Sequence, residues 1–408
     1  MANKTLLVLI FLASATTIYA QPNITSVNGN FIHQNSVTIA GSAFGVKNPA
    51  APILWDDCTS SVPLSTHYDA WLPTEAEQGN QYNMAYRNAG FRNISPPHNK
   101  MNYFLGGAHA ISHHSGTYAK GGNVAIGKNI TSHSYFINYY YRIDPTFDQA
   151  NHPTLGDNMK EIVLTNTAGA FYPDGWGAFG YTGWCGSDVP HVNRKNPIKL
   201  ARRPINPDNQ ELPYSCSGTN LVHHNNPVNG WIKMQWEGNY NHQFDGPQIA
   251  LTTYPDGAKT YQSHYGDGLT ISEYARGPWA NYPKENDLRF IGLGGFARVE
   301  RQNNGINSFR YFAGVYMDNT RARVMLGNNQ DYTSCTMMEP QIPSSWSNSS
   351  ITVGVNLGTL PDSGTAYLFV FDADNNHNQT GFPVTTGGSS GDITPPASPK
   401  GLQIVDLQ

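Results

Sequence analysis

Apolar and polar residues alternate with a period of two in several stretches of this chain. From residue 135 to 143, the odd-numbered positions carry Tyr135, Ile137, Tyr139, Tyr141 and Ile143. From residue 231 to 237, the apolar set Ile232, Met234 and Trp236 alternates with Trp231, Lys233, Gln235 and Glu237. This is the pattern of β-strands, because successive side chains of a strand lie on opposite faces of the sheet. Helical spacing is nearly absent, so the sequence predicts an all-β fold.

The composition fits many short strands joined by turns. The 408 residues include 40 glycines and 27 prolines, and 12% of them are aromatic. Glycine and proline favour turns, and aromatic residues favour strands. A chain of this length is expected to form two domains or one large sandwich. The net charge of −4 gives no basic surface for nucleic acid, so nucleic-acid binding is not expected.

The start of the chain predicts export. Lys4 precedes an apolar run from Leu6 to Phe11, and small residues lead to Ala20. A basic start, a short apolar core and a small residue at the cut are typical of a secretory signal peptide, here residues 1–20. The apolar run is too short to span a bilayer, so no membrane span is expected. We therefore expect a secreted protein, extracellular or at the cell surface.

Four cysteines follow the predicted signal peptide: Cys58, Cys185, Cys216 and Cys335. An even number of cysteines in an exported chain indicates disulfides. Three pairings are open to four cysteines, and we favour Cys185 with Cys216 because both lie in one turn-rich stretch. Cys58 with Cys335 then follows by elimination.

Two regions of the chain, far apart in sequence, resemble parts of an IPT/TIG domain, a small immunoglobulin-like sandwich. Its opening is similar to residues 24–29 and 36–45, and its closing strands are similar to residues 322–327, 341–347, 351–355 and 366–372. The resemblance implies one sandwich split into residues 21–59 and 321–386. The strand that follows Phe44-Gly45 is either Ile53–Trp55 or Val324–Leu326.

The segment between these parts, residues 60–320, resembles a laminin-G or concanavalin-like jelly roll. The stretches that carry the resemblance are 139–143, 158–162, 230–234 and 316–320. The resemblance implies two curved antiparallel sheets, of which the concave face often meets sugars. Residues 387–408, rich in glycine, serine and proline at their start, are expected to be a linker and tail.

Two groups of residues are candidates for glycan binding. Trp176, Tyr181 and Trp184 lie in a glycine-rich segment, and aromatic rings suit the apolar faces of sugars. Lys233, Gln235 and Glu237 form the polar side of one predicted strand and could line the concave sheet. The alternatives are that the aromatic residues pack over an edge of the sandwich and that the polar residues form an ordinary solvated sheet face.

Enzymatic alternatives rest on weaker patterns. The stretch Tyr311–Tyr316 resembles a strand of jelly-roll alginate lyases, in which a tyrosine and a histidine move a proton beside a uronate. The lysine of that strand is missing, and Ala250 stands where that family has its histidine. A glycoside hydrolase needs two carboxylates, and Glu237 has no second carboxylate on its strand.

Metal and cofactor motifs are incomplete. His109 and His113 lie in a segment rich in glycine and serine, and Asp372–Asn376 lacks the glycine and distal glutamate of an EF-hand loop. No cofactor is predicted, and Ca²⁺ in the jelly roll is left open.

We expect a secreted, non-catalytic protein that binds a polysaccharide or cell-surface glycan, or acts in adhesion. A polysaccharide lyase or hydrolase acting in the jelly-roll groove is the first alternative. A structural subunit of an extracellular assembly is the second, and self-association is left open.

Overall fold

A computed structural model describes the chain in sections. These are residues 20–57, 69, 90–92, 97–100, 104–110, 119–132, 134–143, 158–165, 177–182, 198–203, 231–239, 248–253, 259–264, 288–299 and 307–387. They contain antiparallel strands and one 3₁₀-helix, η2 (Tyr332–Ser334), and no α-helix. The predicted all-β class is confirmed. Among these residues, no helix has the length and apolar character needed to cross a membrane.

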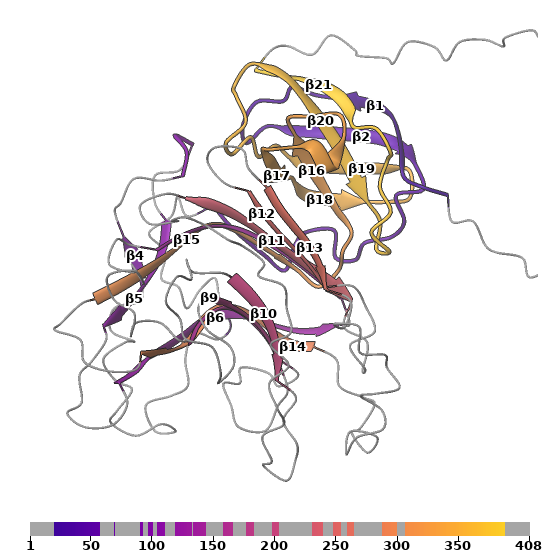
Figure 1. The fold of residues 1–408 in the computed structure, drawn as a ribbon. Coiled ribbons are helices and arrows are strands. Elements are labelled where there is room, and N and C mark those ends of the chain that lie inside the picture. The colour runs from indigo at the N-terminus through magenta and orange to yellow at the C-terminus, as the bar shows by residue number, and fades with distance from the viewer. Residues whose placement is uncertain are drawn as a thin grey trace, which may run out of the picture.

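Strands from the beginning and the end of the described chain form one sandwich, which we call the terminal sandwich (Figure 1). One sheet has the order β1-β2-β19-β18 and the other β17-β16-β20-β21. The strands are β1 (Asn23–Asn28), β2 (Ser36–Ser42), β16 (Arg323–Gly327), β17 (Met338–Pro340), β18 (Ile342–Trp346), β19 (Ser350–Gly354), β20 (Gly364–Phe371) and β21 (Phe382–Thr386).

The core of the terminal sandwich follows from alternation along its strands. Val37 and Ile39 of β2 are buried, whereas Ser36 before them and Thr38 between them are more exposed. Val37 pairs with Val353 of β19, and both belong to the apolar core. The stretch therefore becomes a strand because one of its faces carries only residues that gain by leaving water.

A larger sandwich holds the remaining strands. Its eight-stranded sheet has the order β13-β12-β11-β7-β15-β5-β4, with β3 also paired to β15, and its five-stranded sheet has the order β10-β9-β8-β14-β6. The strands are β3 (Leu54–Asp56), β4 (Gly90–Arg92), β5 (Phe104–Ala110), β6 (Ala119–Ser132), β7 (Ser134–Ile143), β8 (Asn158–Thr165), β9 (Gly177–Thr182), β10 (Ile198–Arg203), β11 (Ile232–Asn239), β12 (Gln248–Thr253), β13 (Lys259–His264), β14 (Leu288–Val299) and β15 (Asn307–Asp318).

The pairing decides between the two strands left open after Phe44-Gly45. β16 (Arg323–Gly327) joins the terminal sandwich by pairing with β20 and β17. Leu54–Asp56 instead pairs with Met317–Val315 of β15, in the eight-stranded sheet. The strand of the terminal sandwich is therefore Val324–Leu326, and the chain has already entered the larger sandwich at Leu54.

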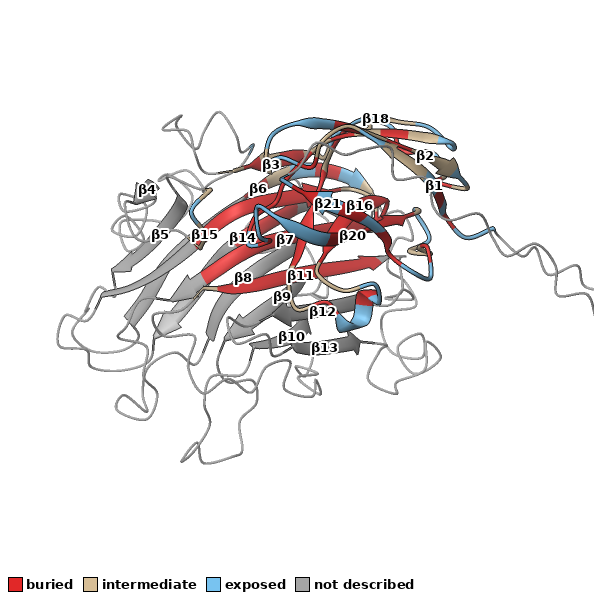
Figure 2. Cartoon of the chain, turned by 90° about the horizontal axis from the view of Figure 1, so that it is seen from above, coloured by how far each residue is buried: buried red, intermediate tan, exposed pale blue. Residues whose placement is uncertain are grey.

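The terminal sandwich lies against the eight-stranded sheet, on the side away from the five-stranded sheet (Figure 1). Figure 2 shows the consequence, because β7 from Tyr135 to Tyr141 and β11 from Ile232 to Gly238 are buried. Phe136 and Tyr316 of the eight-stranded sheet share one apolar cluster with Tyr332, Phe369 and Phe371 of the terminal sandwich. The two sandwiches are thus joined through a continuous core.

Candidate functional site

The polar side of β11 lies inside this contact. Lys233, Gln235 and Glu237 are buried, with exposed fractions of 9%, 3% and 3%. Their partners on the terminal sandwich are, in the same order, Glu339 (Nζ to Oε2, 2.7 Å), Tyr332 (Nε2 to Oη, 2.9 Å) and Arg323 (Oε2 to Nη2, 2.6 Å). The expectation that these three residues present a glycan-binding surface is wrong, because residues 321–377 cover that face of the sheet. We call these residues and their partners the polar interface.

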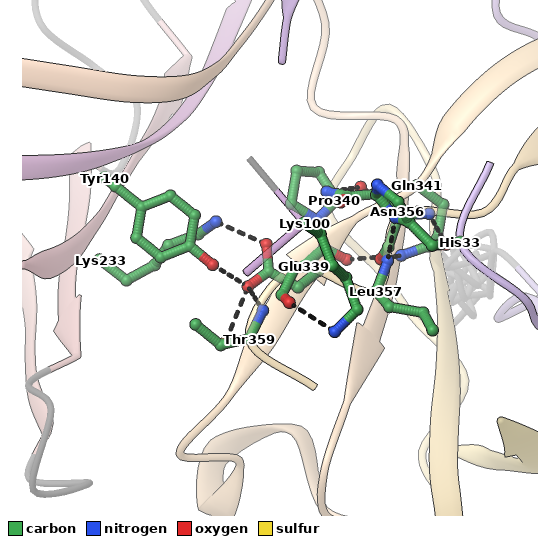
Figure 3. Close-up of polar contacts among 11 residues, drawn as sticks. His33, Lys100, Tyr140, Lys233, Glu339, Pro340, Gln341, Asn356, Leu357 and Thr359 are labelled. Atoms are coloured by element: carbon green, nitrogen blue, oxygen red, sulfur yellow. Dashed lines mark hydrogen bonds and ion pairs between the residues drawn. The ribbon is translucent and has the colours of Figure 1, made fainter. Parts of the chain in front are cut away.

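Glu339 is the centre of one half of the polar interface (Figure 3). Its carboxylate accepts hydrogen bonds from Lys233, from the Tyr140 hydroxyl, and from both the backbone amide (3.1 Å) and the hydroxyl (2.9 Å) of Thr359. Burial alone would raise the pKa of Glu339, but the Lys233 charge, the His98 ring and these hydrogen bonds outweigh burial and lower it. Glu339 is therefore held as a carboxylate.

The backbone around Glu339 is fixed by a second set of contacts. The Gln341 side chain donates to the carbonyl oxygens of Glu339 (3.0 Å) and Asn356 (2.9 Å), and it accepts from the Asn356 amide (3.0 Å). Gly358 has a φ of +47°, and a Cβ atom there would collide with the Glu339 carboxylate. Glycine at this position thus lets the chain approach the carboxylate closely.

Arg323 is the centre of the other half. It is fully buried, and its guanidinium lies over the rings of Phe371 (3.7 Å to the centroid) and Phe136 (4.4 Å). One guanidinium nitrogen donates to Asn375 Oδ1 at 2.7 Å, and Asn375 in turn donates to Glu237 at 3.2 Å. Charge, planarity and hydrogen bonding are all used, which is the role for which arginine is better suited than lysine.

A third buried pair joins Lys47 to Asp318 at the end of β15. Lys47 Nζ lies 2.8 Å from Asp318 Oδ2, and the Tyr316 hydroxyl donates to the same oxygen at 3.1 Å. Burial raises the pKa of Asp318 to about 6, although Lys47 and these hydrogen bonds lower it. Burial also lowers the pKa of Lys47.

The tyrosines of this region are placed as structural hydrogen-bond donors. Tyr140, Tyr316 and Tyr332 are buried, and burial is the main cause that raises the pKa of each hydroxyl. Tyr316 lies in the stretch that resembles a lyase strand, and its hydroxyl is bonded to Asp318 beneath the terminal sandwich. A tyrosine that moves a proton must reach its substrate. The arrangement around β11, β7 and β15 therefore holds two sandwiches together and gives Tyr316 no access to a polysaccharide.

The remaining candidate residues have mixed outcomes. Cys335 is a buried thiol that donates to the carbonyl oxygen of Asn329 at 3.2 Å, so its predicted disulfide with Cys58 is not formed. Cys58, Cys185, Cys216, Trp176 and Trp184 lie outside the described residues, so the pairing of Cys185 with Cys216 stays a prediction. Within the described residues, no three histidine, cysteine, aspartate or glutamate side chains are grouped to hold a metal ion.

Sequence reasoning missed Arg323 and Glu339, and a signal for both was present. Each is a lone charged residue between apolar neighbours. Arg323 lies in Ala322-Arg323-Val324, within a predicted strand, and Glu339 lies in Met338-Glu339-Pro340, within an observed strand. A charge within a strand whose neighbours are buried requires a partner. That pattern identifies a paired buried charge, although it does not identify the partner.

Comparison with known proteins adds resemblances of fold at low identity. No protein-family profile and no curated protein matches the chain. An endo-β-1,4-glucuronan lyase from the fungus Trichoderma reesei is 10% identical, with 65% of this chain and 95% of that chain covered and a TM-score of 0.39. A PL-14 alginate lyase from Aplysia kurodai is also 10% identical (66% and 99% covered, TM-score 0.38). An alginate lyase from Klebsiella pneumoniae is 10% identical (56% and 85% covered, TM-score 0.33). The functional argument therefore rests on the geometry described above.

The polar interface predicts a dependence of stability on pH through His98, whose ring lies edge-on to Tyr140. Burial lowers the pKa of His98 from 6.5 to about 4. On acidification the unfolded chain takes up this proton before the folded chain, so the His98 contribution to stability is lost as the pH falls from 6.5 towards 4. Between about pH 7 and about pH 4.5, the wild type should lose about 2 kcal/mol of unfolding free energy relative to His98→Gln. Urea unfolding at both pH values measures this difference.

Asp318 provides the control, because its pKa shift changes stability with pH in the opposite direction to that of His98. Its pKa in the folded state, about 6, lies above the ordinary value of 3.8, so the folded chain takes up this proton first. The wild type should therefore gain stability relative to Asp318→Asn over the same acidification. A difference between wild type and His98→Gln that does not change with pH would contradict the assignment of a neutral, partly buried His98.

Proposed function

We propose that this chain is a secreted, non-catalytic protein that binds a polysaccharide or cell-surface glycan through the five-stranded sheet of its larger sandwich. The observation that carries the proposal is that the terminal sandwich covers the polar side of the eight-stranded sheet. The charged residues on that side of the sheet, Lys233 and Glu237, form ion pairs with Glu339 and Arg323 of the terminal sandwich. A ligand of the larger sandwich is therefore expected on the other sheet.

The predicted aromatic residues belong to that other sheet or adjoin it in sequence. Tyr181 lies in β9, which pairs with β8 and β10 of the five-stranded sheet. Trp176 directly precedes β9, and Trp184 follows its last residue by two positions. The polar group of candidates therefore lies in the polar interface, whereas Tyr181 belongs to the opposite sheet and the two tryptophans adjoin β9 in sequence. Export through residues 1–20 and an IPT/TIG identity for the terminal sandwich are parts of the same proposal.

The decisive experiment is affinity electrophoresis of the protein lacking residues 1–20 in gels that contain individual polysaccharides, with product release measured in parallel. Retardation without new reducing ends or unsaturated ends supports the proposal. Unsaturated ends would replace it by a lyase, and new reducing ends alone by a hydrolase. If neither retardation nor products are found with any polysaccharide, a structural subunit becomes the better explanation.

Replacing the two tryptophans should abolish most of the binding. We expect Trp176→Ala/Trp184→Ala to weaken retardation at least about tenfold, because covering an aromatic side chain is worth about 1.5–3 kcal/mol. The control is Trp346→Phe on β18, which removes an indole from the terminal sandwich and should leave binding unchanged. Equal binding by the wild type and the double variant would contradict the role of the tryptophans.

A further inference from the structure

Arg321 lies where the chain crosses from the larger sandwich to the terminal sandwich. The crossing is the short link between the end of β15 at Asp318 and the start of β16 at Arg323. Arg321 is buried in this link, with an exposed fraction of 7%. Its backbone carbonyl oxygen accepts a hydrogen bond from Nη1 of Arg323 at 2.8 Å. The backbone of Arg321 is thus tied to the polar interface, and its guanidinium lies among buried groups.

Arg321 differs from the other buried cations of the described part of the chain. Each of the other three forms an ion pair with a carboxylate, and the pairs are Lys47–Asp318, Lys233–Glu339 and Arg323–Glu237. Within the same residues, Arg321 forms no ion pair, and its Nε atom is enclosed by the protein without a hydrogen-bond partner. Buried polar groups of folded proteins are nearly always satisfied by protein, by water or by an ion. The side chain of Arg321 therefore calls for a partner that the described residues do not supply.

The charges around Arg321 do not balance its own. Burial is the main cause that lowers the pKa of Arg321, and the charge of Arg323 acts in the same direction. Glu237 and Asp374 raise it, but Glu237 is already paired with Arg323, and Asp374 is exposed. Arginine nevertheless stays protonated in proteins. Two buried arginines thus face one buried carboxylate, which leaves one positive charge without a counter-charge.

We propose that Arg321 binds an oxyanion, that is, a carboxylate or a phosphate group, at the crossing between the two sandwiches. The planar guanidinium presents parallel N–H donors that match two oxygens of such a group. One bound negative charge balances the charge that Glu237 leaves over. Arg321 also keeps some contact with solvent, from which a small ion can enter, whereas Arg323 is fully buried. The inference is independent of the proposed function, because Arg321 does not belong to the five-stranded sheet.

Water is the other occupant that this position can hold. A water molecule accepts a hydrogen bond from Nε of Arg321, but it brings no charge. An oxyanion accepts the same hydrogen bond and also balances the buried charge, and hydrogen bonds between charged groups are about twice as strong as those between neutral groups. The count of buried charges therefore favours the anion.

Isothermal titration calorimetry with sodium phosphate and with sodium acetate, in a chloride buffer of constant ionic strength, tests the site. We expect one saturable site per chain for at least one of the two anions. Arg321→Met should weaken the affinity at least about tenfold, from the loss of charge-assisted hydrogen bonds. Arg321→Lys keeps the charge without the planar fork, so it should recover only part of the affinity. Lys128→Met removes a partly exposed cation of β6 and should bind as the wild type does.

Thermal unfolding provides a second readout of the same site. An anion that binds the folded chain raises its unfolding temperature until the site is saturated. This saturable rise should be absent from Arg321→Met. Phosphate also stabilises proteins in general, because it is excluded from their surface. That part of the rise does not saturate, and it should be equal in the wild type and in Arg321→Met.

The outcomes decide between an anion and water. Binding of acetate alone identifies a carboxylate site and binding of phosphate alone a phosphate site, and either result supports the proposal. A wild type that binds neither anion shows that Arg321 holds only water, and the proposal is then wrong. Equal affinity of the wild type and Arg321→Met would place the anion elsewhere and overturn the proposal as well. Circular dichroism shows whether each variant folds, and if Arg321→Met does not, equal affinity of Arg321→Lys and the wild type is the overturning result.

Discussion

Replacing Glu339 with glutamine should lower the free energy of unfolding by about 3–5 kcal/mol. The Glu339 carboxylate is buried and neutralises Lys233, and it accepts four hydrogen bonds from Lys233, Tyr140 and Thr359. An amide keeps the shape of the side chain but leaves the Lys233 ammonium buried without a counter-charge. Urea unfolding at neutral pH, followed by tryptophan fluorescence, measures the loss.

Two further variants distinguish this explanation from general damage. Asp69→Asn breaks the more exposed pair between Asp69 and Lys128, and it should cost no more than about 1 kcal/mol. Lys233→Met/Glu339→Leu removes both buried charges, and it should be more stable than Glu339→Gln. If the double variant is the less stable of the two, the cost does not come from an uncompensated charge.

Replacing Arg323 should have an effect of similar size. We expect Arg323→Met to lose about 3–5 kcal/mol, because Glu237 then loses its ion pair and is left as a buried carboxylate that accepts a hydrogen bond from the Asn375 amide. Arg323→Lys should recover only part of the loss. Lysine restores the charge, but it lacks the planar group that lies between Phe136 and Phe371 and that also reaches Asn375. Unfolding in urea at constant ionic strength gives the order of the three proteins.

The lysine variant makes this prediction specific. If Arg323→Lys is as stable as the wild type, charge alone accounts for the site and the stacking between two phenylalanine rings contributes nothing. Arg321, two residues earlier, is the matched control position, since it is also an arginine with little exposure (7%), whereas Arg323 is fully buried and paired with Glu237. Arg321→Met should therefore be the milder replacement.

The sequence was sufficient for the class of fold because alternation is a local property. The period of two in 135–143 and 231–237 predicts strands, and β7 and β11 occupy these stretches. Alternation also separates the two faces of β11 correctly. It cannot say what covers each face, and the cover of Lys233, Gln235 and Glu237 comes from residues about 100 positions away in the chain. Both sequence-based interpretations of the polar face, a glycan-binding surface and an ordinary solvated face, require access to water, but the structure buries this face.

The candidate site was harder to predict than the fold for the same reason. Aromatic residues near β9 are visible in the sequence, but the strands that lie on either side of β9 are decided by the pairing of β8, β9 and β10. Elimination predicts a disulfide for Cys335, but elimination uses no information on distance. Its thiol instead finds a carbonyl oxygen six residues earlier in the chain.

Construction of the terminal sandwich from distant parts of the chain limits the order in which the protein can fold. Thr38 of β2 and Thr352 of β19 lie side by side although 314 residues separate them. During synthesis β1 and β2 have only each other to pair with until β19 has been made, and an isolated two-stranded hairpin is marginally stable at best. Throughout that interval Phe136, Tyr140 and the charged side of β11 have no cover. The newly made chain therefore passes through a stage in which this apolar and charged surface is open to association with other molecules, and that stage ends when Arg323, Tyr332 and Glu339 have been made and cover it.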